Sequence, residues 1–365
     1  MILHLYFARR FLKSFAMVFA VFGGIMLMVD MVEQISRFSE KTVGFADLLG
    51  LSLLHLPSQL YPILPLIMIL ATLVMFLGLA RSSELVVTRA SGRSGMKSLI
   101  APLAVALGLG MFSVAVFNPI VAATSKQYET TASRYASGNE SVLSITEEGL
   151  WLRQGSEKGQ TVIRADGSNL DGTKLVDVSF FSFTTNGTPL DRIEAVSAEL
   201  TEGAWVLKSA KKWPLLSSAN PERDARLFDE LRVSSDLTKE EIRDSFGTPS
   251  SIPIWELPAF IERLDHAGFS ARQHRVWFQT ELALPLMLVA MVLIGAGFTM
   301  RHTRFGGAGQ MVLGALLMGF ALFFIRNFAQ VLGENGQLPV YVAAWSPPIA
   351  ATLLALALIL HLEDG

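Results

Sequence analysis

Six long apolar stretches constrain this chain more than any other feature of its sequence. A helix needs about 20 predominantly apolar residues to cross the hydrocarbon core of a bilayer. Six segments meet that requirement: 13–32, 60–80, 98–121, 276–300, 309–332 and 340–360. Only 17% of the residues are charged, against roughly 25% in ordinary soluble domains. The sequence therefore predicts an α-helical membrane protein with six transmembrane helices, split three and three around a large domain.

The distribution of basic residues predicts how these helices are oriented. Lys and Arg in short loops favour the cytoplasmic side of a membrane. The segments on one side carry Arg9, Arg10, Lys13, Arg81, Arg89, Arg93, Lys97, Arg301 and Arg304. On the other side, the first loop has only Arg37 and Lys41. We therefore expect both termini in the cytoplasm and residues 122–275 outside it, between transmembrane regions 1–121 and 276–365.

The domain between the two helical regions has the pattern of a β-sheet. Residues 175–184 and 192–200 flank Asn186-Gly187, a dipeptide that favours a tight hairpin turn because it tolerates positive φ angles. Further strands are predicted at 149–152, 161–165, 204–210 and 226–233. Many short strands separated by turns are typical of a sandwich or a jellyroll. We expect an extracytoplasmic all-β, jellyroll-like domain.

Two local patterns refine this domain. In the strand at 175–184, Val176, Val178 and Phe180 alternate, after which the apolar residues continue in the opposite phase, so we expect a bulge. Residues 255–266 place apolar side chains on one face of an amphipathic helix. This helix is predicted to connect the β domain to the fourth transmembrane helix.

The sequence carries no motif for a reaction of its own. It has no cysteine, which excludes disulfides, thiolate metal sites and cysteine nucleophiles. It contains no Walker A sequence, no H-E-x-x-H metal motif and no G-x-S-x-G nucleophile elbow. A net charge of -2 without a dense Lys/Arg run gives no reason to expect a nucleic acid partner. We expect a protein that is not an enzyme and has no metal or other cofactor.

Ionisable residues are rare in the predicted transmembrane helices. Such residues are costly in a bilayer and usually functional. Asp30 and Glu281 are expected near the outer ends of their helices, and Arg326 falls in the outer half of the fifth helix. Arg326 is therefore a candidate site residue. It would either contact a ligand or form a buried pair with Glu281 or with another subunit.

The segment after the second transmembrane helix is predicted to dock on a partner. Residues 82–92 predict a short cytoplasmic helix that follows a serine N-cap, carries Glu84 in its first turn and ends at Gly92. Three apolar residues follow Glu84: Leu85, Val86 and Val87. Exposed apolar side chains on such a helix indicate a groove on a partner protein. The alternative is a helix that lies on the membrane surface.

Three strings in the sequence resemble those of a known family. They are RSSELVV at 81–87 with ASG at 90–92, GLW at 149–151, and LALPL at 282–286. With the order of three helices, domain and three helices, these strings resemble the lipopolysaccharide export permeases of the LptF/LptG family, and the LptG branch most. The likeness covers essentially the whole chain.

The resemblance implies a function and a set of partners. It implies a permease subunit of the bacterial inner membrane that pairs with an LptF-like permease and sits on a dimer of LptB-like ATPases, which would use the ATP. Its periplasmic jellyroll would continue into LptC- and LptA-like proteins, along which lipopolysaccharide moves toward the outer membrane. The docking residues would be Glu84, Leu85, Val86 and Arg89. A rival hypothesis is a membrane mechanotransmitter that passes ATPase motion to a periplasmic partner without moving a substrate.

The resemblance also implies where the lipid would bind. LptG-type proteins tend to carry lysines at the outer end of the first helix for the phosphates of the lipid. This chain has Asp30 and Glu33 there, and only Arg37 and Lys41 keep a basic character. The expected substrate-binding residues are therefore Arg37, Lys41 and Arg326.

Overall fold

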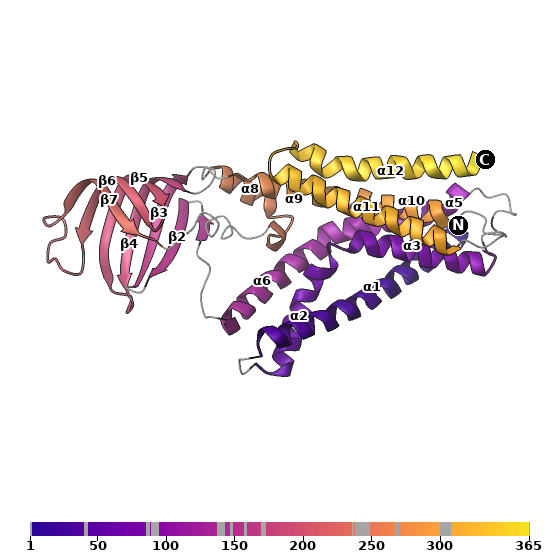
Figure 1. The fold of residues 1–365 in the computed structure, drawn as a ribbon, viewed down its shortest axis with the longest axis horizontal. Coiled ribbons are helices and arrows are strands. Elements are labelled where there is room, and N and C mark those ends of the chain that lie inside the picture. Colours follow the sequence, from indigo (N-terminus) through magenta and orange to yellow (C-terminus); the bar gives the residue numbers. More distant parts are fainter. Residues whose placement is uncertain are drawn as a thin grey trace. The chain divides into compact units, whose positions relative to one another are not determined.

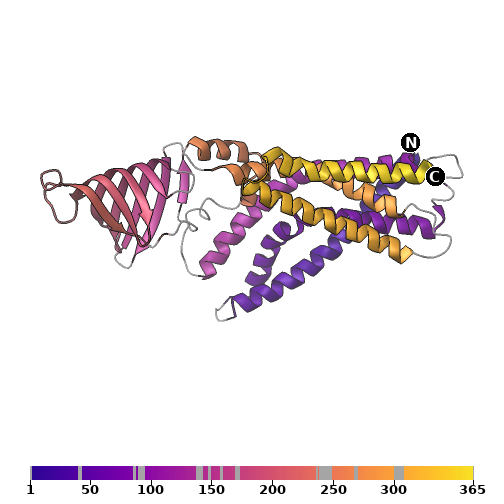
Figure 2. The ribbon, with the colours of Figure 1, turned by 45° about the horizontal axis from the view of Figure 1, so that its top comes forward.

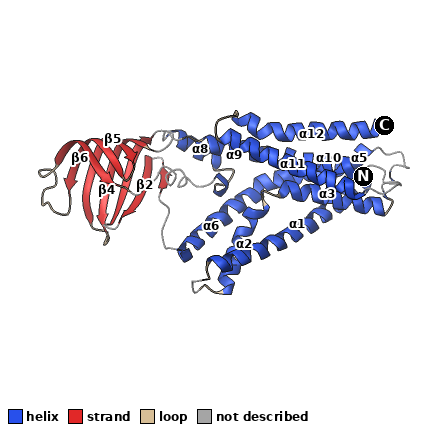
Figure 3. Ribbon diagram, in the orientation of Figure 1, coloured by secondary structure: helices blue, strands red, loops and turns tan. Residues whose placement is uncertain are grey.

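The computed structural model describes most of the chain and divides it into two compact units. The described residues are 2–39, 43–84, 88, 95–136, 143–146, 149–156, 159–168, 173–235, 237, 249–266, 270–299 and 308–364. The helical unit comprises Met1–Gly138, Ser250–Trp255 and Arg272–Gly365, and the sheet unit comprises Asn139–Pro249 and Glu256–Ala271. Figure 3 shows that the described strands all belong to the sheet unit.

The helical unit is built from long helices, labelled in Figure 1. Its first half contains α1 (Ile2–Arg37), α2 (Phe45–Leu60), α3 (Leu64–Arg81), α5 (Gly95–Phe112), the π-helix η1 (Ser113–Phe117) and α6 (Asn118–Ala136). Its second half contains α9 (Arg272–Leu282), α10 (Leu284–Thr299), α11 (Ala308–Glu334) and α12 (Val340–Asp364). A short 3-10 helix, η2 (Pro249–Ser251), precedes the second half.

Most of these helices are suited to a bilayer, as the sequence predicts. Among the described residues, five helical segments are long and apolar enough to span one: Ile2–Arg37, Leu64–Arg81, Met96–Ala132, Gly309–Glu334 and Val340–His361. A sixth candidate is the pair α9 and α10, which bends by 48° at its break. The predicted number of six is reached when this bent pair is one span.

Several helix ends differ from the prediction. Helix α1 has 36 residues, a length of ~54 Å at about 1.5 Å per residue, so it is longer than a bilayer core. Helix α2 was not predicted, because its 16 residues fall short of the apolar length used to identify a span. The helical unit also continues to Gly138, past the predicted boundary at 121, because α6 runs on to Ala136.

Helix α10 forms the centre of the helical unit. It packs against α3, α5, α11 and α12, and most of its residues are buried. The close approach of α10 to α3 and α5 depends on glycine residues. A Cβ added at Gly110 would lie 2.5 Å from Cα of Pro285, and one at Gly295 would lie 2.9 Å from Cβ of Thr72. Small residues at such contacts let helix backbones approach, which is how helices associate within a membrane.

The sheet unit contains one antiparallel sheet of seven strands in chain order, so each strand pairs with its neighbours in sequence. The strands are β1 (Leu143–Thr146), β2 (Gly149–Ser156), β3 (Gly159–Ser168), β4 (Lys174–Thr184), β5 (Pro189–Thr201), β6 (Ala204–Pro214) and β7 (Arg226–Ser234). Figure 2 shows the same strands from a second direction. The predicted hairpin is confirmed, with Gly187 at a φ of 79° in its turn. An antiparallel β domain is thus present, and its jellyroll character stays a prediction.

A crease crosses this sheet. Asp177 in β4 and Ser209 in β6 have positive φ values of 50° and 52°, which are unusual for residues with a side chain. On either side of these positions the strands bury residues three apart, as with Leu175 and Val178 in β4. Two successive side chains therefore face outward, and Val176 is 50% exposed although its alternation with Val178 predicted otherwise. A register irregularity between Ser182 and Phe183 lies close to the predicted bulge.

The crease explains how a single sheet encloses a core. The buried side chains of the sheet unit are 7% exposed at most, and they come from both sides of the crease. Phe180 and Trp205, two fully buried aromatic residues, meet edge to face with ring centroids 6.3 Å apart. The predicted connector helix is present as α8 (Leu257–His266), and its Phe260, Ile261 and Leu264 pack on this core.

Candidate functional site

A polar cluster joins the segment after α3 to the start of α1. We call Tyr6, Arg10, Ser82 and Glu84 the Glu84 cluster. The Tyr6 hydroxyl donates to Oε2 of Glu84 at 2.6 Å, and Arg10 Nη1 donates to Oε1 at 3.0 Å. The Ser82 hydroxyl donates to Oε1 at 2.7 Å. Tyr6 and Arg10 lie four residues apart on α1, so both reach the same carboxylate.

The Glu84 cluster is accessible to water. The side chains of Arg10 and Glu84 are each 34% exposed, so their ion pair is partly screened. The hydrogen bond from Tyr6 lowers the pKa of Glu84 below its ordinary value. Glu84 and Thr88 are both helical, and the Thr88 hydroxyl donates to the carbonyl of Glu84 at 2.7 Å. Three predicted docking residues, Leu85, Val86 and Arg89, lie outside the described residues.

A second polar cluster lies near the other end of α1, where the sequence predicted substrate contacts. We call Asp30, Gln34, His55, Gln59 and Tyr128 the Asp30 cluster. Asp30 is fully buried, and its Oδ1 lies 2.6 Å from His55 Nδ1 and accepts a hydrogen bond from Gln59 at 2.7 Å. Gln34 donates to Tyr128 at 2.9 Å, and Tyr128 stacks on His55 with ring centroids 4.3 Å apart. The cluster therefore links α1, α2 and α6.

Arg37 lies at the edge of the Asp30 cluster. Its Nη1 donates to the Tyr128 hydroxyl at 3.3 Å, and its guanidinium carbon is 5.6 Å from the centre of the Phe38 ring. The residue is exposed, so most of its donors face outward. Lys41, the other basic residue predicted here, lies outside the described residues.

Arg326, the third predicted substrate residue, is buried beside Glu281. Arg326 is 8% exposed and Glu281 is 1% exposed. The carboxylate of Glu281 accepts hydrogen bonds from the Tyr61 hydroxyl and from Asn118 Nδ2. No oxygen of Glu281 lies within 4.0 Å of the Arg326 guanidinium, so these two described residues attract each other without forming a close ion pair. Both side chains line a cavity of about 300 Å³, which we call the Arg326 cavity.

Three helix irregularities meet at Glu281. Tyr61 lies in the turn between α2 and α3, and Asn118 directly follows the π-helix η1. Glu281 itself is next to the last residue of α9, at the bend toward α10. Irregular helix segments free backbone groups and often mark functional positions. The sequence identified Arg326 and Glu281, but it gave no signal that Tyr61 and Asn118 would join them.

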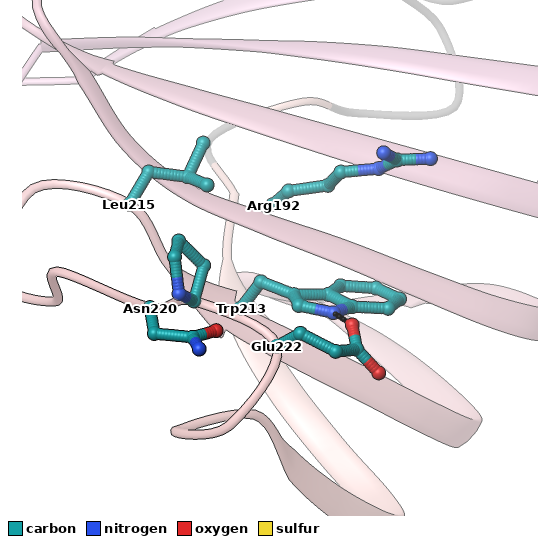
Figure 4. A pocket seen from close by; sticks show the side chains of 6 residues that line it. Arg192, Trp213, Leu215, Asn220 and Glu222 are labelled. Atoms are coloured by element: carbon teal, nitrogen blue, oxygen red, sulfur yellow. Dashed lines mark hydrogen bonds between the residues drawn. The ribbon is translucent and has the colours of Figure 1, made fainter.

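The sheet unit has a pocket of its own, shown in Figure 4. The pocket has a volume of about 390 Å³ and is lined by Arg192, Trp213, Leu215, Asn220, Pro221 and Glu222. Two cations lie near the ring of Trp213. The Arg192 guanidinium is 5.5 Å and the Lys211 ammonium 4.7 Å from the ring centre. Glu222 accepts hydrogen bonds from Lys211 and Trp213, both at 2.5 Å, which lower its pKa. These groups satisfy one another at the surface, so the pocket points to no particular ligand.

The described residues offer no metal site. They contain no group of three or more His, Asp or Glu side chains close enough to hold an ion. What the helical unit does contain is charge at both ends of α1 and inside the Arg326 cavity. Ionisable side chains inside helices that can span a membrane usually mark functional positions.

Comparisons with known proteins agree over nearly the whole chain. A family model described as "Lipopolysaccharide export system permease LptF/LptG" matches residues 5–361. The "Lipopolysaccharide export system permease protein LptG" of Haemophilus influenzae is 24% identical over 314 residues, which are 86% of this chain and 84% of the relative. The protein of the same name from Escherichia coli (strain K12) is 23% identical over 345 residues, which are 93% of this chain and 91% of the relative.

Proposed function

Because the chain belongs to the LptF/LptG family of lipopolysaccharide export permeases, we propose that it is one permease subunit of an ABC-type complex that exports lipopolysaccharide. The chain extracts the lipid from the inner membrane and passes it to a periplasmic bridge of β-jellyroll proteins that leads to the outer membrane. The observation that carries this proposal is the family match over residues 5–361, which includes both units and the Glu84 segment.

The proposed complex has four kinds of partner. A second, LptF-like permease completes the membrane part, and an LptB-like ATPase dimer supplies the energy. LptC- and LptA-like proteins form the bridge. The lack of a Walker A sequence supports this division of labour, since the chain needs an ATPase from elsewhere.

The proposed orientation places both termini in the cytoplasm and the sheet unit in the periplasm. The basic residues of the short loops support it. In this orientation α9 and α10 form one bent span, which gives six spans in all.

The Glu84 cluster is the proposed connection to the ATPase. In the isolated chain the Glu84 carboxylate pairs with Arg10. Because this pair is partly exposed, an arginine of the ATPase can replace Arg10 at little cost. Leu85 and Val86 would then enter a groove on the ATPase, and Arg89 would complete the contact. ATP-driven motion of the ATPase would reach the membrane through this segment and through α1.

The proposed lipid contacts are Arg37, Lys41 and Arg326. The exposed guanidinium of Arg37 has donors free of Tyr128 that can bind two phosphate oxygens at once. Arg37 stands at the end of α1, beyond the apolar stretch, at the depth where lipid phosphates lie.

The change of Glu84 to Ala tests the proposed function. Removing one member of a close charge pair at an interface costs about 2–5 kcal/mol, so Glu84→Ala should strongly reduce both association with the ATPase and release of lipopolysaccharide onto an acceptor. Association is measured by copurification, and release is measured with reconstituted proteoliposomes.

Arg10→Gln is the matched control, because it removes the partner of Glu84 within the chain and keeps the carboxylate. This variant should still bind the ATPase. If Glu84→Ala binds the ATPase and exports lipid at wild-type levels, the docking role is wrong. The same assay tests the rival hypothesis of a mechanotransmitter. If the wild-type complex hydrolyses ATP and changes the conformation of the acceptor but releases no lipid onto it, the chain transmits motion without carrying a substrate.

A further inference from the structure

The Arg326 cavity presents hydrogen-bond donors that the protein leaves unused. Arg326 is buried, and no hydrogen bond from its guanidinium to any described residue exists in the structure. The indole nitrogen of Trp277, which also lines the cavity, is buried without a partner among the described residues. Buried donors are nearly always satisfied in folded proteins. Two orphaned donors in one cavity therefore indicate a missing acceptor.

One carboxylate oxygen of Glu281, which also lines the cavity, is already occupied. Oε2 of Glu281 accepts from Tyr61 and from Asn118, which lie on the side of α2, α3 and α6. Glu281 is close enough to offset part of the Arg326 charge but does not hydrogen-bond it. The unused donors of Arg326 and Trp277 match an oxyanion with several oxygens. A guanidinium binds phosphate oxygens in pairs, and an indole N–H can bind a third.

The surroundings of the cavity identify the kind of anion. Arg326 lies eight residues before the end of α11 at Glu334, which is ~12 Å along the helix axis. Apolar side chains also line the cavity: Pro62, Leu284 and Val331, of which Val331 on α11 is 49% exposed. A soluble phosphate would gain nothing from these apolar neighbours, whereas the acyl chains of a lipid would cover them.

We propose that the Arg326 cavity binds the phosphate of a lipid headgroup in the outer leaflet of the inner membrane. Its volume, about 300 Å³, is at the lower limit for ligand pockets, so it takes the headgroup while the chains lie along α11. The proposal rests on the proposed function only for the orientation of α11 in the membrane. The lipid is either a glycerophospholipid or the exported lipopolysaccharide, since both carry phosphate.

The test is native mass spectrometry of the full-length chain in detergent, with phosphatidylglycerol as the probe and diacylglycerol, which lacks the phosphoglycerol headgroup, as the comparison. We expect phosphatidylglycerol to bind and diacylglycerol to bind at least tenfold more weakly. Arg326→Gln should weaken phosphatidylglycerol binding at least tenfold. Arg326→Lys, which keeps the charge but loses the paired donors, should weaken it less. Trp277→Phe, which removes only the N–H, should weaken it about threefold.

Two further measurements keep the outcomes distinct. Arg223→Gln removes an exposed arginine of the sheet unit and should change nothing, while melting temperatures report whether Arg326→Gln remains folded. If Arg326→Gln unfolds, the phosphatidylglycerol binding of Trp277→Phe and of Arg326→Lys decides whether the cavity binds phosphate. Equal binding of the two lipids, or unchanged binding by all three cavity variants, would overturn the proposal.

Competition with lipopolysaccharide separates the two sources of the phosphate. Displacement of phosphatidylglycerol by lipopolysaccharide would mean that the cavity binds the exported lipid during transport. Retention of phosphatidylglycerol would make the cavity a site for a resident membrane lipid. Either result supports the phosphate site, and the site can exist even where the complete complex exports no lipid, so the failure of the proposed function would be seen separately.

Discussion

The two ends of helix α1 hold carboxylates in opposite ways. At the start of α1, Tyr6 and Arg10 bind Glu84, which comes from another segment and is 34% exposed. Toward its other end, α1 itself supplies Asp30, which is fully buried and is held by neutral or weakly basic side chains of α2. In the first contact both partners are partly exposed, whereas in the second the carboxylate itself is fully buried.

This difference separates a contact that can be exchanged from one that is fixed. An ion pair near water contributes about 0–1 kcal/mol because solvent screens it, so a partner can replace it. A buried carboxylate that loses its donors, or donors that lose a buried carboxylate, leave polar groups unsatisfied. We infer that α1 is anchored at the Asp30 cluster and is free to change partners at the Glu84 cluster.

The largest expected effect is at the fixed end. Asp30→Leu removes the shared acceptor of His55 and Gln59, which stay 2.9 Å from each other, so we expect a cost of about 1–3 kcal/mol in all. We expect a clear loss of stability in thermal or denaturant unfolding of the purified chain. Asp30→Asn keeps one acceptor oxygen and should lose less.

Glu33→Gln is the control for Asp30, because Glu33 lies on the same helix but is exposed. Exposed substitutions of this kind change stability by about 0.5 kcal/mol or less. Comparable losses in Glu33→Gln and Asp30→Leu would show that the Asp30 cluster does not anchor α1.

A charge swap tests the exchangeable end. Arg10→Glu or Glu84→Arg alone replaces an attractive pair by like charges, and each should cost about 0.2–1 kcal/mol of stability. The double variant restores the pair within the chain, so its stability should return to that of the wild type. Export should stay low, because an arginine at position 84 repels the arginine expected on the ATPase. The readouts are melting temperature and lipid release onto an acceptor.

The pH used for the swap follows from the pKa of Glu84. Because the pKa of Glu84 is lowered in the folded chain, its pairing stabilises the fold above the ordinary carboxyl value and is lost as the pH falls through the lowered one. Neutral pH therefore keeps the pair charged. Recovery of both stability and export in the double variant would mean that Glu84 acts only within the chain, and the docking role would have to be abandoned.

The sequence predicted regular elements well, because their signals are local. Apolar length predicted the long helices, and alternation with Asn186-Gly187 predicted the central hairpin. Strand β1 was missed because four residues carry too little pattern. Helix α2 was missed because its 16 residues are too few to meet the length required of a span. The crease was not predicted because it depends on a positive φ angle at Asp177, which the identity of that residue does not indicate.

The candidate site shows the same limit more sharply. Glu84 was identified from its place in a helical turn, yet its contact with Tyr6 and Arg10 joins segments more than 70 residues apart in sequence. Arg10 was read only as a basic residue that orients α1. Arg326 was identified because an arginine is costly in an apolar helix, but its cavity exists only where α9 and α11 meet the break before α3.

The smallest effect is expected in the middle of α1, between the two ends. Gly23 and Gly24 lie side by side there, and adjacent glycines are places where a helix can bend. An added Cβ at Gly24 meets nothing within 4 Å, and one at Gly23 meets only Cδ1 of Leu60 at an ordinary 3.7 Å. Gly24→Ala should therefore stabilise the chain by about 0.5–1 kcal/mol, the gain from helix propensity. If α1 transmits motion by bending between a fixed end and an exchangeable one, this more stable variant should export lipid more slowly, with Gly23→Ala behaving alike. Higher stability with unchanged export would show instead that α1 moves as a rigid rod, in which case the Asp30 cluster must shift whenever the Glu84 cluster does.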